Sequence, residues 1–126
     1  MVQSTLAAIP NAQLKAYIVW EPIRSWDSMA SARSSQALVR DPRARQFWAH
    51  GLDLAVRTQN AIDLKGEPAW DVYLLYDANA NWEADAVPKP ADYMHQLGGR
   101  LPDDKLLDPD SLTARVSRIA ESTRGR

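Results

Sequence analysis

The chain has 126 residues, no cysteine, a net charge of −1 and an apolar fraction of 45%, which is ordinary for a globular protein. This length predicts one domain, over residues 1–126, and the near-neutral charge favours neither nucleic acid nor anionic lipid as a partner. The absence of cysteine excludes disulfides, thiolate nucleophiles, thiol–disulfide exchange and cysteine metal sites.

The N-terminal residues carry little structural signal. The first fifteen lack the charged start and long apolar run of a signal peptide, and no window of the chain is long enough to span a membrane. We therefore expect a soluble protein of the cytoplasm or the periplasm. Residues 1–14 are weakly patterned, and residues 5–9 are consistent with either a short strand or a helical turn that ends at Pro10.

A strand and a helix are predicted next. Residues 15–20 alternate apolar side chains between two faces and end at Glu21 and Pro22, which is typical of a strand. Residues 25–39 predict a helix, because the side-chain oxygen of Ser25 or Asp27 can cap the free N–H groups of its first turn.

A shorter strand and a second helix follow. Residues 46–50 form a strand candidate that contains Phe47 and Trp48. Residues 52–64 predict a helix, because residues at i, i+3, i+4 and i+7 spacing share one face, which is expected to lie inward: Leu52, Ala55, Val56, Gln59 and Ile62. We expect the 46–50 strand at the edge of the sheet, beside residues 15–20. An uncovered edge with aromatic side chains invites pairing with another chain, so a homodimer through this edge or through exposed aromatics is predicted.

Residues 69–77, AWDVYLLYD, form the strongest strand pattern, rich in β-branched and aromatic residues. Both faces are apolar in the middle, which indicates cover on both sides; a buried helical segment is the alternative. We expect the 15–20 strand to be its neighbour. Residues 79–90 predict a loop, and residues 93–97 a fourth strand that ends at two glycines.

The final helix has the clearest start signals. Asp108 is predicted to cap it, Pro109 to occupy its first position and Asp110 to complement its dipole. Residues 123–126 are expected to form a flexible tail. The predicted inner stripe is Leu112, Val116, Ile119 and Ala120, and the predicted outer face is Arg115, Arg118 and Glu121.

The expected order is strand, helix, strand, helix, strand, strand, helix. With right-handed crossovers, this order gives an α/β domain with a mixed sheet of about four strands and helices on both faces.

This order resembles the thioredoxin core, and the segment AYIVWEPIRSWDSM resembles the thioredoxin central strand with its loop and helix. The chain also resembles a group of uncharacterised bacterial thioredoxin-like proteins without redox cysteines, in the segments WEP, DPR…FW, WDVYLL and MHQLGG. The likeness covers most of residues 15–122. It implies a thioredoxin-like fold in which Arg24 and Asp27 occupy the positions of the two family cysteines.

Open α/β sheets place ligand crevices at the carboxyl ends of their central strands, where loops and helix N-termini converge. If the thioredoxin-like register holds, Arg24 offers forked donors there and Trp26 a flat apolar surface. The simpler alternative is a solvated loop with one Arg24–Asp27 ion pair. The predicted ligand-binding residues are Glu21, Arg24, Trp26, Asp27, Tyr93 and His95.

Catalytic and metal sites have weaker support. Tyr93 and His95 share a strand face and could act as an acid/base pair, but a half-buried strand face is the commoner case. Glu21 and Asp71 could form a carboxylate pair at strand ends, where solvated carboxylates are commoner. His50 and His95 do not make a metal site on sequence grounds, so no metal or other cofactor is expected.

The five tryptophans divide by their context. Trp20, Trp48 and Trp70 lie in predicted strands and are expected to fill the core, whereas Trp26 and Trp82 lie in predicted loops and are candidates for a binding surface.

Two functions follow from these observations. The first is a non-redox thioredoxin-like domain that serves as a binding or scaffold module and has no catalytic residues. The alternative is a small non-thiol enzyme or small-molecule binder with a site near Arg24, Tyr93 and His95. A redox partner is a weaker interpretation, because exchange begins with thiolate attack.

Overall fold

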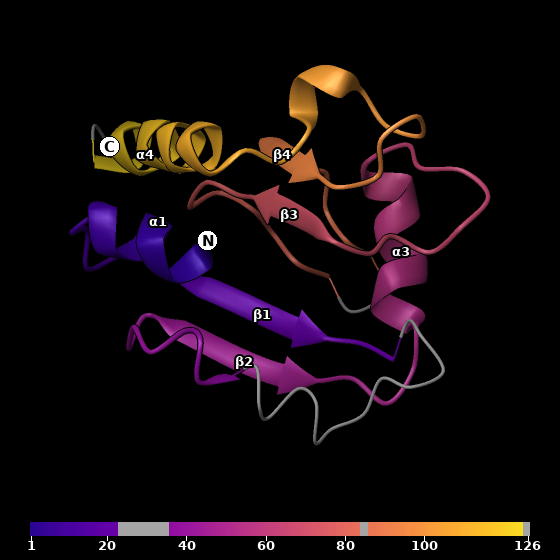
Figure 1. Cartoon of the computed structure of the whole chain (residues 1–126), viewed down its shortest axis with the longest axis horizontal. Coiled ribbons are helices and arrows are strands. Elements are labelled where there is room, and N and C mark those ends of the chain that lie inside the picture. The colour runs from indigo at the N-terminus through magenta and orange to yellow at the C-terminus, as the bar shows by residue number, and fades with distance from the viewer. Residues whose placement is uncertain (23–35, 84–85, 125–126) are drawn as a thin grey trace. The chain divides into compact units, whose positions relative to one another are not determined.

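The computed structural model describes residues 1–22, 36–83 and 86–124 (Figure 1). The chain divides into two compact units, Met1–Leu52 and Asp53–Arg126. Both strands and helices are present, so the α/β class is confirmed, whereas the single domain remains a prediction. None of the described helices is long and apolar enough to cross a membrane. The elements are α1 (Val2–Ala8), β1 (Ala16–Trp20), β2 (Ala44–Trp48), α3 (Asp53–Ala61), β3 (Val72–Leu75), β4 (Asp92–His95), the 3₁₀ helix η1 (Asp103–Lys105) and α4 (Pro109–Arg124).

The first unit contains a parallel pair of strands. β1 and β2 lie side by side, with Ala16 opposite Ala44 and Trp20 opposite Trp48 (Figure 1). This pairing confirms the expected proximity of the two segments, although β2 begins and ends two residues earlier than predicted. The predicted 25–39 helix falls mainly outside the described residues; residues 37–40 are turn and coil.

The N-terminal segment is helical, which decides between the two conformations left open for residues 5–9. Leu6 and Ile9 are buried, and Arg43 donates hydrogen bonds to the backbone carbonyls of Leu6, Ile9 and Asn11 at the end of α1. Gln3 accepts the backbone N–H groups of Arg40 and Asp41. The helix is therefore held by residues more than thirty positions away in the sequence.

The second unit contains an antiparallel pair, in which Val72 lies opposite His95 and Leu75 opposite Asp92. β3 starts later than the predicted 69–77 strand because Asp71 has a left-handed backbone (φ 50°), which interrupts the extended conformation, and it ends at Leu75, two residues earlier than predicted. The described ladders pair β1 with β2 and β3 with β4, so the expected pairing of the 15–20 and 69–77 strands is not among them.

The core of the second unit combines the segment that follows α3, β3 with the residues before it, and β4 with the loop after it. Asp63 has a left-handed backbone (φ 56°), so α3 ends before the predicted residue 64. Val56, expected on the inner face, is exposed, whereas Thr58 is buried. The buried cluster is Ile62, Leu64, Ala69, Leu97 and Leu101, with Trp70, Val72, Leu74 and Tyr93 packed against it.

The final helix starts as predicted. The Asp108 carboxylate accepts the backbone N–H of Ser111 at 2.8 Å, and this hydrogen bonding lowers the pKa of Asp108. Leu112 and Ala120 are buried, whereas Val116 and Ile119 are half-buried. The outward position predicted for Arg115 is wrong, because its side chain is only 18% exposed. The helix continues to Arg124, two residues into the predicted tail.

Candidate functional site

The predicted ligand-binding residues are distributed over both units. Arg24, Trp26 and Asp27 lie outside the described residues. Glu21 is half-buried and follows β1 in the first unit. Tyr93 and His95 are neighbours on β4 in the second unit, with ring centroids 6.3 Å apart.

His95 is a buried structural residue. Its side chain has no exposed surface, Nε2 lies 2.7 Å from the carbonyl oxygen of Pro102, and Nδ1 accepts the N–H of Leu97 at 3.0 Å. Because Nδ1 accepts, the proton lies on Nε2 and is donated to Pro102. Both ring nitrogens are therefore used by the backbone, and neither is left to act as an acid or base with Tyr93.

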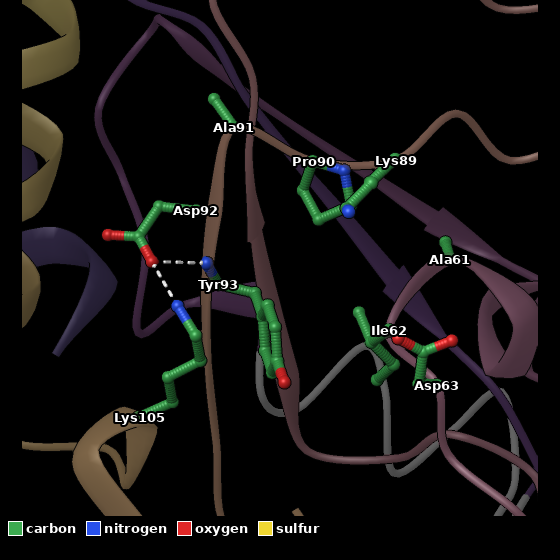
Figure 2. Close-up of a pocket in the computed structure, with 9 residues that line it drawn as sticks. All are labelled: Ala61, Ile62, Asp63, Lys89, Pro90, Ala91, Asp92, Tyr93 and Lys105. Carbon is green, nitrogen blue, oxygen red and sulfur yellow. Dashed lines mark hydrogen bonds and ion pairs between the residues drawn. The ribbon is translucent and has the colours of Figure 1, made fainter. Parts of the chain in front are cut away.

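Tyr93 lines an open-sided pocket of about 250 Å³ in the second unit (Figure 2). The walls are residues 61–63 at the end of α3, residues 89–93 that lead into β4, and Lys105 of η1. In the view of Figure 2, Asp92 and Lys105 lie on one side of Tyr93, and Ile62 and Asp63 lie on the other. We call this the Tyr93 pocket.

One wall of the Tyr93 pocket is held by Asp92. Its carboxylate accepts hydrogen bonds from Lys105 Nζ at 2.8 Å and from Arg115 Nη1 at 2.8 and 2.9 Å. Partial burial raises the pKa of Asp92, but the hydrogen bonds from Lys105 and Arg115 outweigh it, so the pKa lies below its ordinary value. The fixed Lys105 ammonium lies 4.7 Å from the centre of the Tyr93 ring, within cation–π range.

Three polar groups of the Tyr93 pocket are available to a ligand. Within the described ranges, the Lys89 ammonium, the Asp63 carboxylate and the Tyr93 hydroxyl have no hydrogen-bond or ion-pair partner. Burial raises the pKa of Tyr93; Lys105 opposes this rise, and nearby carboxylates, including Asp63, add to it. The Tyr93 hydroxyl therefore stays protonated at neutral pH and can donate a hydrogen bond.

A second surface lies in the first unit, on the outer face of β1 and β2. Tyr17 and Phe47 are 67% and 48% exposed, and their rings stack with centroids 6.5 Å apart and an interplanar angle of 23°. Val19 is exposed beside them, and the exposed cations Lys15 and Arg45 precede the apolar residues on the two strands. We call these five residues the aromatic face.

The tryptophans only partly follow their expected roles. Trp20, Trp48 and Trp70 are half-buried rather than enclosed in the core. Trp82 is 52% exposed, as expected for a loop residue, and it contacts Tyr76 edge-on at 5.2 Å between centroids. Because Trp26 lies outside the described residues, only Trp82 of the proposed surface pair can be placed.

Comparison with protein-family models, curated proteins and solved structures finds no match for the chain. The thioredoxin-like resemblance therefore rests on the sequence motifs. In the described part of the chain, no group of three or more acidic or histidine side chains could hold a metal ion.

Sequence reasoning identified Tyr93 but missed the charged residues around it. Asp63, Lys89, Asp92 and Lys105 come from three separate segments, and no local spacing connects them. The ion pair of Lys105 with Asp92 joins two of these segments, and the third enters the Tyr93 pocket only in the folded chain.

Proposed function

We propose that the chain is a non-redox, thioredoxin-like binding module that associates with a second copy of itself through the aromatic face. The absence of cysteine supports a role without thiol chemistry. The parallel β1–β2 pair and the antiparallel β3–β4 pair, followed by α4, agree with the element order of a thioredoxin core. A single four-stranded sheet is part of this proposal.

The stacked, exposed pair of Tyr17 and Phe47 is the observation that carries the proposal. Parallel strands usually have both faces covered, whereas this pair exposes two aromatic rings and Val19 to solvent. Contiguous exposed apolar side chains mark interaction sites, and aromatic residues supply much of the binding energy at interfaces. The aromatic face therefore supports a partner chain.

The arrangement of charge favours a second copy as that partner. Because β1 and β2 are parallel and in register, Lys15 and Arg45 lie toward the amino ends of the strands, and Val19 and Phe47 toward the carboxyl ends. A twofold axis perpendicular to the strands would place the end of each face that carries Lys15 and Arg45 over the end of the other that carries Val19 and Phe47. Arg45 can then stack on Phe47 of the second copy, while like charges stay apart.

Sedimentation velocity over a range of protein concentrations tests this proposal. We expect the wild-type chain to dimerise with increasing concentration and the double variant Tyr17→Ser with Phe47→Ser to remain monomeric. Trp82→Ser, which also removes an exposed aromatic ring, is the matched control and should still dimerise. At concentrations where the wild type is still monomeric, the melting temperatures of all three should be similar, since exposed substitutions usually change stability little.

A wild-type chain that is monomeric at every concentration would overturn the dimer, as would a dimer that survives the double substitution. A monomer that binds a labelled single-stranded oligonucleotide through Tyr17 and Phe47 would assign the aromatic face to nucleic acid instead, against the expectation from net charge.

A small-molecule binder is the second candidate function, and the free polar groups of the Tyr93 pocket are the observation that favours it. The backbone hydrogen bonds of His95 favour binding over acid/base catalysis at this site. A thermal-shift screen of metabolites tests the candidate, because a ligand at 100 times its dissociation constant adds about 2.7 kcal/mol of stability. A screen without any stabilising compound would count against it.

A further inference from the structure

We propose that the Tyr93 pocket binds a small zwitterion, with a carboxylate at Lys89, an ammonium group at Asp63 and an apolar body against Tyr93. This inference rests on the small-molecule candidate function and does not depend on the dimer.

The charges that line the Tyr93 pocket are balanced. Asp92 and Lys105 neutralise each other through their ion pair at 2.8 Å, and Arg115 adds a second cation to Asp92. Among the described residues, this leaves one cation, Lys89, and one anion, Asp63, without partners. Both residues are exposed, and a zwitterion can pair with the two at once, whereas a simple anion or a simple cation can pair with only one of them.

The remaining wall of the Tyr93 pocket is apolar, which favours a ligand with an apolar part. Ile62, Pro90 and the ring of Tyr93 line the space between the charged groups, and Ile62 and Pro90 are buried (Figure 2). Lys105 holds one face of the Tyr93 ring through its cation–π contact. An aliphatic or aromatic body can bury its surface against this wall.

The volume limits the ligand to a small molecule. At about 250 Å³ the Tyr93 pocket is smaller than the 300–1,000 Å³ typical of drug-sized ligands. A free amino acid with an apolar side chain combines the required size, the two opposite charges and the apolar body.

Three probes that share a phenyl group separate the contributions of the ligand's carboxylate and ammonium group to binding. L-Phenylalanine carries both charges, 3-phenylpropanoate lacks the ammonium group, and phenethylamine lacks the carboxylate. Titration of the full chain, followed by amide NMR shifts at Ala91 and Tyr93, gives a dissociation constant for each. We expect phenylalanine to bind at least about tenfold more tightly than either analogue, which corresponds to one lost charge-assisted hydrogen bond.

Two substitutions, each with a matched control, assign the charges. Asp63→Asn should weaken phenylalanine about tenfold and leave 3-phenylpropanoate unchanged, and asparagine tolerates the left-handed backbone at this position. Asp71→Asn, at the other left-handed aspartate and outside the Tyr93 pocket, should change neither probe. Lys89→Gln should weaken phenylalanine and 3-phenylpropanoate, whereas Lys65→Gln, also exposed and outside the pocket, should not.

Equal binding of phenylalanine and 3-phenylpropanoate, with no effect of Asp63→Asn, would overturn the zwitterion while leaving a small-molecule site. Absence of saturable binding for all three probes would overturn this inference, and if the metabolite screen is also negative, the small-molecule function fails with it.

Discussion

The Asp41 carboxylate fixes the Arg43 guanidinium at the end of α1. Asp41 accepts hydrogen bonds from Arg43 Nε at 3.0 Å, from Nη2 at 2.7 Å and from the Arg43 backbone N–H at 2.9 Å. The guanidinium then donates to the carbonyl oxygens of Leu6, Ile9 and Asn11. The pair connects α1 to the segment before β2, and it adds a second hydrogen bond to three carbonyls that also accept the backbone N–H groups of Ile9, Asn11 and Leu14.

The Asp41–Arg43 pair predicts a loss of stability in acid. Hydrogen bonds from Arg43 lower the pKa of Asp41 from 3.8 to about 2. A lowered pKa means that the stabilisation is fully present above the ordinary value and is lost as the pH falls from about 4 to about 2. Urea unfolding of wild type and Asp41→Asn across this range should show their midpoints converging in acid. Parallel curves for the two proteins would contradict this role for Asp41.

Because Arg115 pairs with Asp92, replacing Arg115 should lower stability more than replacing Arg118, which also lies on α4. Arg115 is part-buried, and it also donates to the carbonyl of Asp104 at 2.8 Å, whereas Arg118 is exposed. Arg115→Gln should cost about 1–2 kcal/mol, because it leaves Asp92 with fewer charged donors. Arg118→Gln, the control, should cost less than about 0.5 kcal/mol. Urea unfolding measures both, and equal losses would show that the pair contributes nothing specific.

Replacing the buried His95 is expected to lower the free energy of unfolding strongly, because its ring nitrogens hold two backbone groups. His95→Phe keeps a buried ring but removes the acceptor of the Leu97 N–H and one of the two donors to the Pro102 carbonyl, which should cost about 2–4 kcal/mol. His95→Gln can restore one of these bonds and should cost less. Chemical unfolding measures the difference, with exposed Gln96→Ala as the control. A His95→Phe variant of native stability would show that the backbone bonds are dispensable.

The stability lost on replacing Leu112 measures how much the apolar stripe of α4 contributes to its packing. Leu112 is 3% exposed, so Leu112→Ala should lose about 2–5 kcal/mol from the transfer and cavity terms. Val56→Ala, on the exposed face of α3, should lose less than about 0.5 kcal/mol. Thermal and urea unfolding compare the two variants. A small effect at Leu112 would mean that α4 is held by Arg115 rather than by its apolar stripe.

Local chemistry in the sequence was sufficient for several elements. Asp108 and Pro109 set the start of α4, since a cap and a proline act within one helical turn. The alternation of residues 15–20 and the apolar run at 69–77 identified two strands, and Tyr93 was recognised as a candidate site residue. The absence of cysteine excluded thiol chemistry without any structure.

Tertiary structure alone decided the features that depend on distant residues. Arg115 turns inward because Asp92, 23 positions away, provides its carboxylate, and α1 is held by Arg43, 34 positions from Ile9. The Tyr93 pocket likewise requires Asp63, Lys89 and Lys105 from separate segments. Capping and periodicity are read within a few residues, whereas ion pairs and pockets depend on which segments the folded backbone brings together, and no local pattern in this sequence specifies that.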